Sequence, residues 1–396
     1  MSTRTFLAAA LASLLAACGS SSTSTTTARM NVRLVDAPTT DYKQVNVDVQ
    51  TVQILNGTDW ITLGSPNKVV DLLSLTNGVY ETLVDGATLP AGQYGQMRLI
   101  LGSRNTVVLP DDTVKDLTVP SGQQSGIKMT VNFDVKEGTT ADVFIDFDAH
   151  RSIFVHQAGA SGKYILRPTV RAYDKLVTGS ISGTLLGTGN AALAGVTVTA
   201  QTSGTGGPSV ARSTFTDANG HYVLDLLPMK DAGGADITYY GVSQPVIRDG
   251  SGNATASYVA QASPGIVLTQ TAPTATWNAT FATAAATGTI AGSITPVATE
   301  AQGDTVEILQ DLATGSGSTT LLVRSVAAAV TGTPATETYA VDALPTAADP
   351  AATTYGVVGI RRTVDTSGNE TFSTSNPIAP VAVPAGGTAT ANLTFP

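Results

Sequence analysis

The chain has 396 residues, of which 42% are hydrophobic and 13% charged, with 39 glycines, 19 prolines and one cysteine. This hydrophobic fraction excludes wholesale disorder, and the length suffices for two or three domains. The formal net charge of -9 argues against a nucleic-acid partner and against adsorption to a bare anionic membrane. One cysteine excludes an intrachain disulfide and a multi-cysteine metal site.

The first element is an apolar segment, residues 6–17 (FLAAALASLLAA), which follows Arg4 and is too short to span a bilayer. Its composition is typical of the apolar core of a secretory signal peptide. Its end resembles a bacterial lipobox, at which the cysteine is lipidated and the preceding peptide removed. The lipobox positions are Leu15, Ala16, Ala17 and Cys18. The alternative is a buried helix followed by a chance cysteine.

The lipobox resemblance implies a membrane anchor on Cys18. Two or three acyl chains hold a protein stably at a bilayer, whereas one chain holds it only marginally. Residues 1–17 are then a cleaved signal peptide, and residues 18–29 are the lipidated cysteine with a Ser/Thr linker spanning roughly 17 to 20 Å. An Asp directly after the lipidated cysteine would resemble the inner-membrane retention signal of some bacteria. This chain has Gly19 there, so the outer membrane is favoured over the inner membrane. The sequence predicts an exported lipoprotein of the cell envelope.

Apolar and polar residues alternate along residues 30–174, which predicts an antiparallel β-sandwich. Residues 45–54 change phase at Thr51, which indicates a bulge. Asn56-Gly57 follows and suits a tight hairpin turn. Further strands are expected at residues 30–34, 59–63, 96–101, 105–109, 127–133, 141–147 and 164–170. Only residues 69–77 suggest a helical turn.

Six ordered motifs run through residues 29–173. They are VDAP at 35–38, VDLL at 70–73, LPAGQY at 89–94, PSG at 120–122 with Ile127-Lys128, IDFDA at 145–149 and LRP at 166–168. Together they resemble a bacterial lipoprotein domain, the domain-of-unknown-function family numbered 4382. The resemblance implies export and no particular activity.

The density of charged residues falls near residues 174–178, which marks an expected domain boundary. Residues 178–285 include TDANGHYVL at 216–224, a strand, a turn and a strand, in which Asp, Asn and Gly favour a tight reversal. This run resembles the carboxypeptidase regulatory-like domain, a small transthyretin-like sandwich. No zinc-ligand or catalytic motif of the associated enzymes accompanies it, so the resemblance implies no peptidase.

Residues 287–396 repeat the preceding unit in ordered matches. TGTIAGSI at 287–294 matches the opening at 178, YAVDALP at 339–345 matches YVLDLLP at 222–228, and Tyr355-Gly356-Val357 matches Tyr240-Gly241-Val242. The second copy lacks the Asp-Ala-Asn-Gly turn. The predicted fold class is therefore all-β, with three tandem antiparallel β-sandwiches at residues 30–174, 178–285 and 287–396. The last two are Ig-like or transthyretin-like.

Metal and calcium sites find little support in the sequence. The histidines His150 and His156 have Asp146 and Asp148 nearby, but a strand does not bring all four side chains together. We therefore expect surface polar residues and no metal site. The pairs Asp217 with Asn219 and Asp249 with Asn253 lack the spacing of a calcium loop, and turn chemistry explains them better.

Catalysis is equally weakly indicated. The chain has no Gly-x-Ser-x-Gly elbow, and Ser203–Gly207 lacks the lysine of a phosphate-binding loop and predicts a hairpin loop. We therefore assign no catalytic residue, cofactor or metal ligand. Trp60 and Trp277 are weak candidates for ligand binding, because exposed aromatics stack on sugars, although their alternating strand positions favour packing.

Three functions stay open. The leading hypothesis is a membrane-anchored, non-catalytic structural or interaction module of the cell envelope, with an envelope protein or polysaccharide as partner. The alternative is a carbohydrate- or peptide-binding surface lipoprotein. The third is a hydrolase with an unrecognised site. The membrane, through the lipid on Cys18, is the expected partner in all three, and no nucleic acid is expected.

Overall fold

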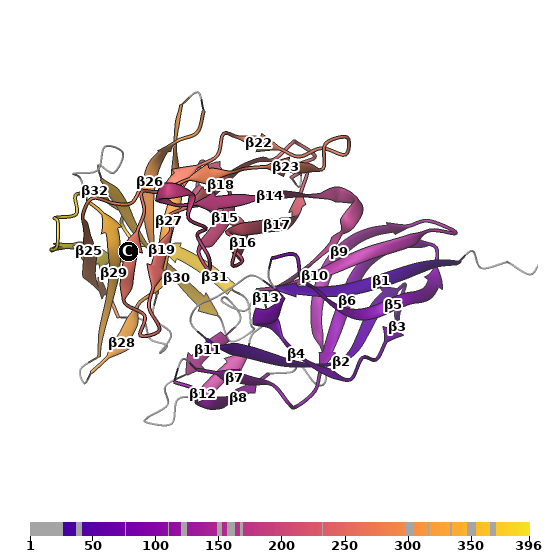
Figure 1. Ribbon diagram of the computed structural model, residues 1–396. Helices are drawn as coiled ribbons and strands as arrows, with labels where there is room; N and C mark the ends of the chain where they lie inside the picture. The colour runs from indigo at the N-terminus through magenta and orange to yellow at the C-terminus, as the bar shows by residue number, and fades with distance from the viewer. Residues whose placement is uncertain are drawn as a thin grey trace, which may run out of the picture.

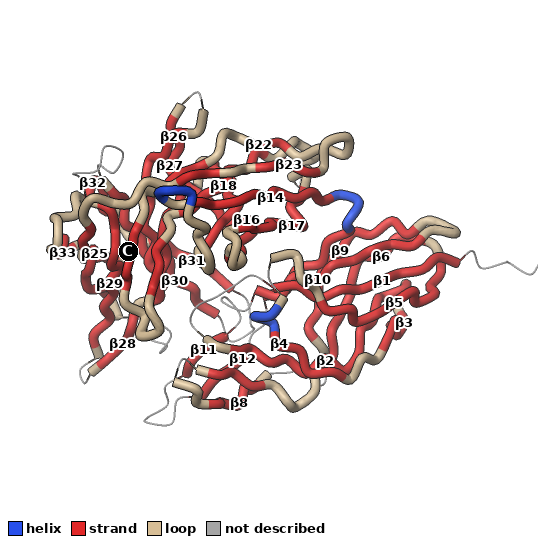
Figure 2. Tube along the Cα trace, in the orientation of Figure 1, coloured by secondary structure: helices blue, strands red, loops and turns tan. Residues whose placement is uncertain are grey.

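The computed structural model describes residues 27–36, 42–75, 77–109, 111–119, 125–148, 153–156, 163–166, 169–231, 233–297, 304–315, 317–332, 335–346, 354–364 and 370–396. In these ranges the helical segments are short 3-10 turns: η1 Leu72–Ser74, η3 Lys175–Val177 and η4 Thr188–Asn190. All other elements are β-strands, arranged in three successive sandwiches (Figures 1 and 2). The predicted all-β fold class is confirmed. The described part of the chain holds no helix of the length and hydropathy that a membrane span requires.

The first sandwich contains strands β1 to β13. Their bounds are β1 Thr27–Asp36, β2 Gln44–Asn56, β3 Asp59–Gly64, β4 Lys68–Asp71, β5 Glu81–Pro90, β6 Gly92–Leu101, β7 Thr106–Val108, β8 Val114–Thr118, β9 Ile127–Val135, β10 Thr140–Asp148, β11 Ile153–His156, β12 Lys163–Leu166 and β13 Thr169–Asp174. One sheet has the order β13-β10-β1-β5, and the other β11-β12-β8-β7-β2-β6-β9 with β3 and β4 also paired to β2. The pairs β1 with β10 and β8 with β12 are parallel, so the sandwich is largely but not wholly antiparallel.

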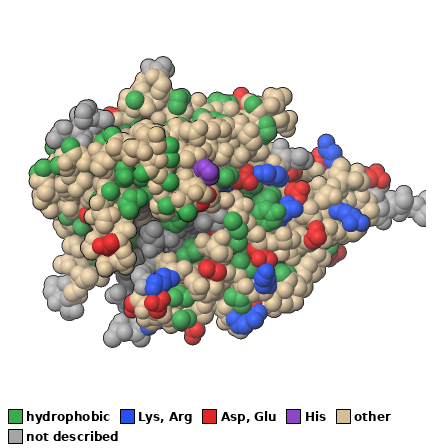
Figure 3. Space-filling view, in the orientation of Figure 1, with side chains coloured by type: hydrophobic (Ala, Val, Ile, Leu, Met, Phe, Trp, Pro, Cys, Tyr) green, Lys and Arg blue, Asp and Glu red, His purple; other side chains and the backbone are tan. Residues whose placement is uncertain are grey.

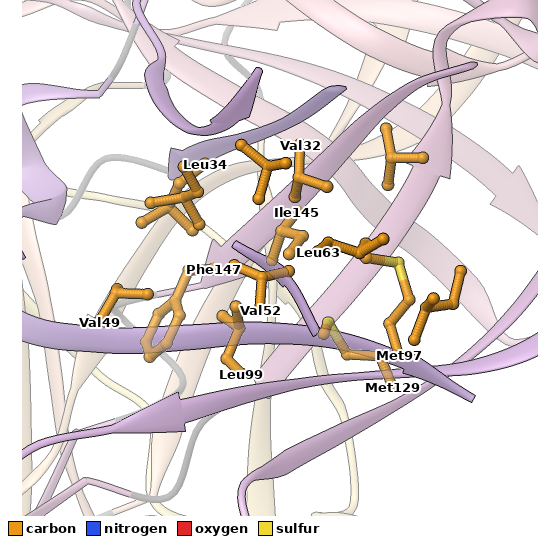
Figure 4. Packing of buried hydrophobic residues seen from close by; sticks show 14 of the residues in the cluster. Val32, Leu34, Val49, Val52, Leu63, Met97, Leu99, Met129, Ile145 and Phe147 are labelled. Atoms are coloured by element: carbon orange, nitrogen blue, oxygen red, sulfur yellow. The ribbon is translucent and has the colours of Figure 1, made fainter. Parts of the chain in front are cut away.

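The core of the first sandwich lies between these two sheets. Apolar side chains from both sheets point into the space between them (Figure 4). The labelled side chains include Val32, Leu34, Ile145 and Phe147 from one sheet and Val49, Val52, Met97 and Leu99 from the other. Because a strand turns every second side chain to the same face, the alternation in the sequence produces this layer directly.

β2 has the bulge that its sequence predicts. Its buried apolar side chains are Val45, Val47, Val49, Val52 and Ile54. The pairing with β6 shifts register between Val49 and Thr51, where the phase of the sequence changes. The bulge keeps apolar side chains on the core face in both halves of the strand, because a slip of one residue would otherwise turn the second half outward.

The turns that follow β2 depart only slightly from expectation. Asn56 pairs with Asp59 around Gly57, whose φ is 61°, so the hairpin forms as predicted. The helical turn expected within residues 69–77 is shorter than predicted. Val70 is in β4 and pairs with Val47 of β2, and only η1 is helical. Tertiary pairing takes the β-branched valines into the sheet.

The second sandwich contains β14 to β24 and the third β25 to β34. The bounds in the second are β14 Thr178–Leu186, β15 Thr197–Gly204, β16 Gly207–Phe215, β17 His221–Pro228, β18 Thr238–Ser243, β19 Val246–Arg248, β20 Ala254–Ser257, β21 Gln261–Ala262, β22 Ile266–Val267, β23 Thr274–Thr276 and β24 Ala279–Thr280. Those in the third are β25 Thr287–Thr295, β26 Thr305–Ala313, β27 Ser318–Ala327, β28 Ala329–Thr331, β29 Thr336–Pro345, β30 Tyr355–Val364, β31 Glu370–Thr374, β32 Ile378–Val381, β33 Thr388–Thr390 and β34 Leu393–Thr394.

These two sandwiches share one connectivity. β14 pairs antiparallel with β17 and parallel with β23 and β24, and β25 pairs in the same way with β29, β33 and β34. In the second sheet β15 lies between β16 and β18, as β26 lies between β27 and β30. The repeat read from the sequence is therefore also a repeat of topology.

Equivalent tyrosines refine the alignment of the two copies. Tyr239 donates its hydroxyl hydrogen bond to the Pro228 carbonyl at 2.7 Å, and Tyr355 donates to the Pro345 carbonyl at 2.8 Å. Tyr355 therefore corresponds to Tyr239, and the match of Tyr355 with Tyr240 proposed above is wrong by one residue. The reason is the strand's alternation: Tyr239 faces the core, while Tyr240 is only half-buried on the other face.

The Asp-x-x-Gly turn of the second sandwich forms as predicted. The Asp217 carboxylate accepts hydrogen bonds from the backbone N–H groups of Asn219 at 2.8 Å and His221 at 2.9 Å. Asp231 and Asp249 cap two further turns in the same way. These bonds turn the carboxylates toward the backbone, which supports turn chemistry over a calcium loop. The Ser203–Gly207 hairpin loop also forms, because Gly204 pairs with Gly207.

Candidate functional site

The structure packs Trp277 inside the second sandwich, as its alternating position favours, and does not present it as a ligand platform. Its exposed fraction is only 8%, and its ring lies edge-on to Tyr222 with 6.3 Å between centroids. Tyr222 also donates its hydroxyl hydrogen bond to the Trp277 carbonyl at 2.8 Å. A Cβ on Gly241 would lie 2.5 Å from the indole, so the ring is packed directly against that backbone. Trp277 is a core residue of the second sandwich.

Trp60 is half-buried in β3, and one of its faces is already occupied. The guanidinium carbon of Arg98 lies 4.1 Å from the centre of the ring, within range of a cation–π contact. Arg98 is held there by a 2.7 Å hydrogen bond to the Gln53 side chain. A sugar could stack on that face of Trp60 only by displacing Arg98.

The other residues singled out by sequence lie in three different settings. Cys18 and the rest of the lipobox fall outside the described residues, as does His150. Asp146 accepts a hydrogen bond from Arg212. The Nδ1 atom of His221 lies 3.8 Å from Oδ2 of Asp217. Within the residues that the structure describes, no group of three or more His, Cys, Asp or Glu could hold a metal ion.

The residues that the structure does bring together lie where the first and second sandwiches meet, which we call the first seam. Arg212 of β16 is 7% exposed and donates through Nη1 to Asp146 of β10 and through Nε to the Asp225 carbonyl at 3.0 Å. Lys175 completes the set with a 2.5 Å contact to the Asp225 carboxylate. Arg212 therefore connects two sandwiches through one nearly buried guanidinium.

Asn77 makes a second set of hydrogen bonds between the first and second sandwiches. Its backbone N–H donates to the Thr214 hydroxyl at 2.9 Å, and its side-chain oxygen accepts from the Val223 N–H at 2.7 Å. Asn77 has a φ of 56° and precedes Gly78, so a left-handed turn presents both groups to β16 and β17. The cavity left beside Asn77 measures about 30 Å³, which is room for about one or two water molecules.

An exposed aromatic borders the first seam. Tyr80 is 48% exposed, and its ring meets that of Phe144 edge-on at 5.8 Å. The Arg33 guanidinium lies 5.1 Å from the centre of the Tyr80 ring and contacts Asp142 at 2.5 Å. Burial alone would raise the pKa of Asp142, but hydrogen bonds from Asn31 and Arg33 outweigh it and lower that pKa. Hydrophobic atoms bordered by basic and acidic side chains are visible near this seam (Figure 3).

Sequence reasoning missed Tyr80 and Arg33. Both sit in ordinary strand or turn contexts, and their proximity depends on packing between β1 and the segment before β5. The available signal was Asn77-Gly78, a pair that favours positive φ and marks a turn at the end of an apolar run. A turn can be predicted from such a pair, but not which surface it meets.

The second seam, between the second and third sandwiches, is closed by a buried amide. Gln201 is 0% exposed and pairs with the backbone of Leu322, donating to its carbonyl at 2.7 Å and accepting from its N–H at 2.9 Å. Ser257 donates to the Ala343 carbonyl at 2.6 Å. Val242 of the second sandwich belongs to the same apolar cluster as the core of the third. This seam is both apolar and hydrogen-bonded.

Residues 27–168 match the family model described as "Domain of unknown function (DUF4382)", which supports the resemblance for the first sandwich. No curated protein matches the chain.

Among solved structures, the Bacillus anthracis TIE protein is 13% identical with a TM-score of 0.19, covering 93% of this chain and 51% of that one. This chain thus spans about half of the TIE protein. A Streptococcal ancillary pilin is 9% identical with a TM-score of 0.20, covering 93% and 99%. A putative adhesin from Bacteroides ovatus is 9% identical with a TM-score of 0.18, covering 50% and 82%. At these TM-scores the likeness carries no argument about function.

Proposed function

We propose that this protein is a membrane-anchored, non-catalytic lipoprotein of the cell envelope, in which three β-sandwiches form a rigid spacer and interaction module. The observation that carries the proposal is that each seam is closed by buried polar contacts. Arg212 closes the first seam and Gln201 the second. Domains of one chain are mobile by default unless their interface is specific and well packed. Removing one partner of a buried ion pair typically costs about 3 to 5 kcal/mol, so the Arg212–Asp146 pair favours a fixed arrangement at the first seam.

The positions of the ends of the fold support a spacer. β1 begins at one end of the first sandwich, and the C-terminus lies in the third sandwich at the opposite end of the molecule (Figure 1). A lipid on Cys18 would then hold the first sandwich next to the membrane and the third sandwich farthest from it. The proposal favours the outer membrane over the inner membrane, because Gly19 and not Asp follows the cysteine.

The domain division belongs to the same proposal. We propose a signal peptide at residues 1–17, a linker at 18–29, and domains at 30–174, 178–285 and 287–396. The shared connectivity of β14–β24 and β25–β34 supports the last division. The Asp-x-x-Gly hairpin supports kinship of the second domain with the carboxypeptidase regulatory-like domain.

The anchor is tested by replacing Cys18 with Ser. Cells expressing the wild-type chain should incorporate a fatty-acid analogue into it, and Cys18→Ser should abolish the label and retain residues 1–17. Ser20→Ala, two residues away, is the matched control and should label normally. Label that persists in Cys18→Ser contradicts the anchor.

The rigid first seam is tested by a distance measurement. Spin labels at exposed Thr58 and Thr205, in a Cys18→Ser background, should give one narrow distance distribution. Arg212→Ala should broaden it, because Asp146 loses the partner that crosses the seam. Lys43→Ala, which breaks an exposed contact with Asp112, should leave it narrow. A distribution already broad in the parent chain contradicts the spacer.

Glycan binding at the first seam is a second candidate, favoured by one observation. Tyr80 is an exposed aromatic flanked by Arg33 and Asp142, which together offer a stacking surface and hydrogen-bonding groups. Binding to a glycan array that Tyr80→Ala abolishes and Trp277→Phe retains would support it. The third hypothesis, a hydrolase, is not proposed.

A further inference from the structure

The second seam holds two arginines around one carboxylate. Arg248 makes a bidentate contact with Asp342, with Nη2 2.6 Å from Oδ1 and Nη1 2.9 Å from Oδ2. Arg324 comes no closer to that carboxylate than 3.9 Å, which is beyond hydrogen-bond distance. Arg248 therefore uses both oxygens of Asp342, and these three described side chains together carry two positive charges and one negative charge.

One donor atom of Arg324 has no hydrogen-bond partner among the residues that the structure describes. Its Nη1 is buried and has no acceptor in the described part of the chain, while its side chain as a whole is 18% exposed. Burial and then the neighbouring charge of Arg248 lower the pKa of Arg324. Buried donors are nearly always paired, and an exception calls for a water or an ion. Excess positive charge selects an anion.

The first copy of the repeat shows what fits beside this arginine. Arg212 pairs with Ala200 in β15, and Arg324 pairs with Ile308 in β26, each next to a register shift. Each lies near an aspartate, Asp225 or Asp342, that precedes a residue with left-handed φ, Leu226 or Ala343. Arg212 and Arg324 therefore occupy equivalent positions.

The two equivalents differ in one respect. Arg212 donates a hydrogen bond to a carboxylate oxygen of Asp146, which belongs to the neighbouring sandwich. At Arg324 the neighbouring sandwich instead supplies a second cation, Arg248. Arg248 donates hydrogen bonds to Asp342, the aspartate nearest to Arg324. The carboxylate that satisfies Arg212 thus has no counterpart among the described residues around Arg324.

We propose that Arg324, with Arg248 beside it, forms a binding site for a small carboxylate anion at the second seam, in the place that Asp146 takes beside Arg212. The side chains of Arg248 and Asp342 are 33% and 50% exposed, so this group lies at the solvent-facing edge of the second seam. A carboxylate between two guanidinium groups makes charge-assisted hydrogen bonds, about twice as strong as neutral ones. This site is independent of the proposed spacer function.

The test is denaturant unfolding of the full chain in acetate and in chloride at equal ionic strength. At an acetate concentration ten times the dissociation constant, the ratio of folded to unfolded protein should rise about elevenfold, and it should keep rising as acetate is added. Arg324→Gln should remove this increment. Arg212→Gln should keep this acetate-dependent increment, because Arg212 is already paired with the Asp146 carboxylate of the same chain.

Three results would overturn the site. The first is equal stability of the wild-type chain in acetate and in chloride. The second is an acetate-dependent stabilisation that is undiminished in Arg324→Gln. The third is an equal stabilisation by phosphate, which would indicate a site without preference for carboxylates. If Arg324→Gln does not fold, ¹⁵N resonances of arginine side chains in the wild-type chain replace it. Saturable acetate shifts at Arg324 support the site, and their absence refutes it.

Discussion

Asp48 shows how one charged residue is accommodated inside the first sandwich. It is 2% exposed and lies on β2. Its carboxylate accepts from the Arg104 guanidinium at 2.8 and 3.0 Å, from the Arg104 N–H at 3.2 Å and from Gln50 at 2.6 Å. A Cβ on Gly102 would lie 2.2 Å from this carboxylate, so a larger residue there would have to displace the Asp48 side chain. The pairing offsets the cost of burying a charge.

This pairing predicts a pH-dependent stability. The hydrogen bonds from Arg104 hold the pKa of Asp48 below its usual 3.8 in the folded state. A depressed folded pKa means that the stabilisation is complete above about pH 4 and is lost as the pH falls through the folded pKa. Asp48→Asn should lower the free energy of unfolding at pH 7 by about 1.5 to 3 kcal/mol.

Urea unfolding between pH 2 and pH 7 measures this effect. The Asp48→Asn chain should lose less stability on acidification than the wild-type chain, because it no longer has this carboxylate to protonate. Asp134→Asn, at an exposed position of β9, is the control and should behave as wild type. Parallel pH profiles for Asp48→Asn and wild type would contradict the assignment.

For single residues, the sequence indicated which side chains are aromatic or charged, but it did not indicate which of them are exposed to solvent. Trp277 was a weak candidate for ligand binding for which packing was favoured, and it is a core residue, whereas Tyr80 was not singled out and is 48% exposed. Whether an aromatic side chain faces solvent depends on what covers it in the folded chain. Coverage of Trp277 comes from Gly241 and Tyr222, which lie 36 and 55 residues away in the chain.

At the scale of elements, turns and bulges were the most predictable features. The bulge in β2 and the Asn56-Gly57 hairpin follow from local residue order, because period and φ preference are local properties. The parallel pair β1 and β10 was not predicted. Their partners Asn31 and Asp142 are far apart in the chain, and nothing local to either strand encodes the pairing.

The Asp217 turn gives a matched pair of substitutions at this scale. Gly220 has a φ of 78°, and a Cβ there would lie 2.4 Å from the Leu185 carbonyl. Gly252 closes the same kind of turn with a φ of 84° and has open space around it. Gly252→Ala should cost only the left-handed strain, about 1 kcal/mol. Gly220→Ala should add a backbone clash and cost at least about 2 to 3 kcal/mol.

Thermal or urea unfolding of the two variants measures the difference. Equal losses in the two variants would mean that the Gly220 turn does not pack against β14 as described. A loss confined to Gly252→Ala would contradict the contact outright.

At the scale of the whole molecule, the second seam determines how the chain unfolds. Val242 and Ala260 of the second sandwich pack in the cluster of the third, and Gln201 pairs with the backbone of Leu322. The two sandwiches should therefore unfold in one cooperative transition.

Gln201→Ala tests this coupling. It leaves the Leu322 N–H and carbonyl without the Gln201 amide, which should cost about 2 to 3 kcal/mol and split the calorimetric transition of these sandwiches in two. Gln93→Ala, at an exposed position of β6, should leave the transition unchanged. Two transitions already present in the wild-type chain would contradict the coupling.

The sequence by itself determined the strand pattern, the tight turns and the internal repeat. Each of these is written in residues that are neighbours in the chain, through alternation, φ preference or a contiguous motif. Only the tertiary structure decided which aromatic is exposed, which strands pair in parallel and how the sandwiches meet. Arg212 and Asp146 are 66 residues apart, and Gln201 and Leu322 are 121 residues apart. Such contacts are selected by the shape and burial of whole surfaces, which no local pattern records.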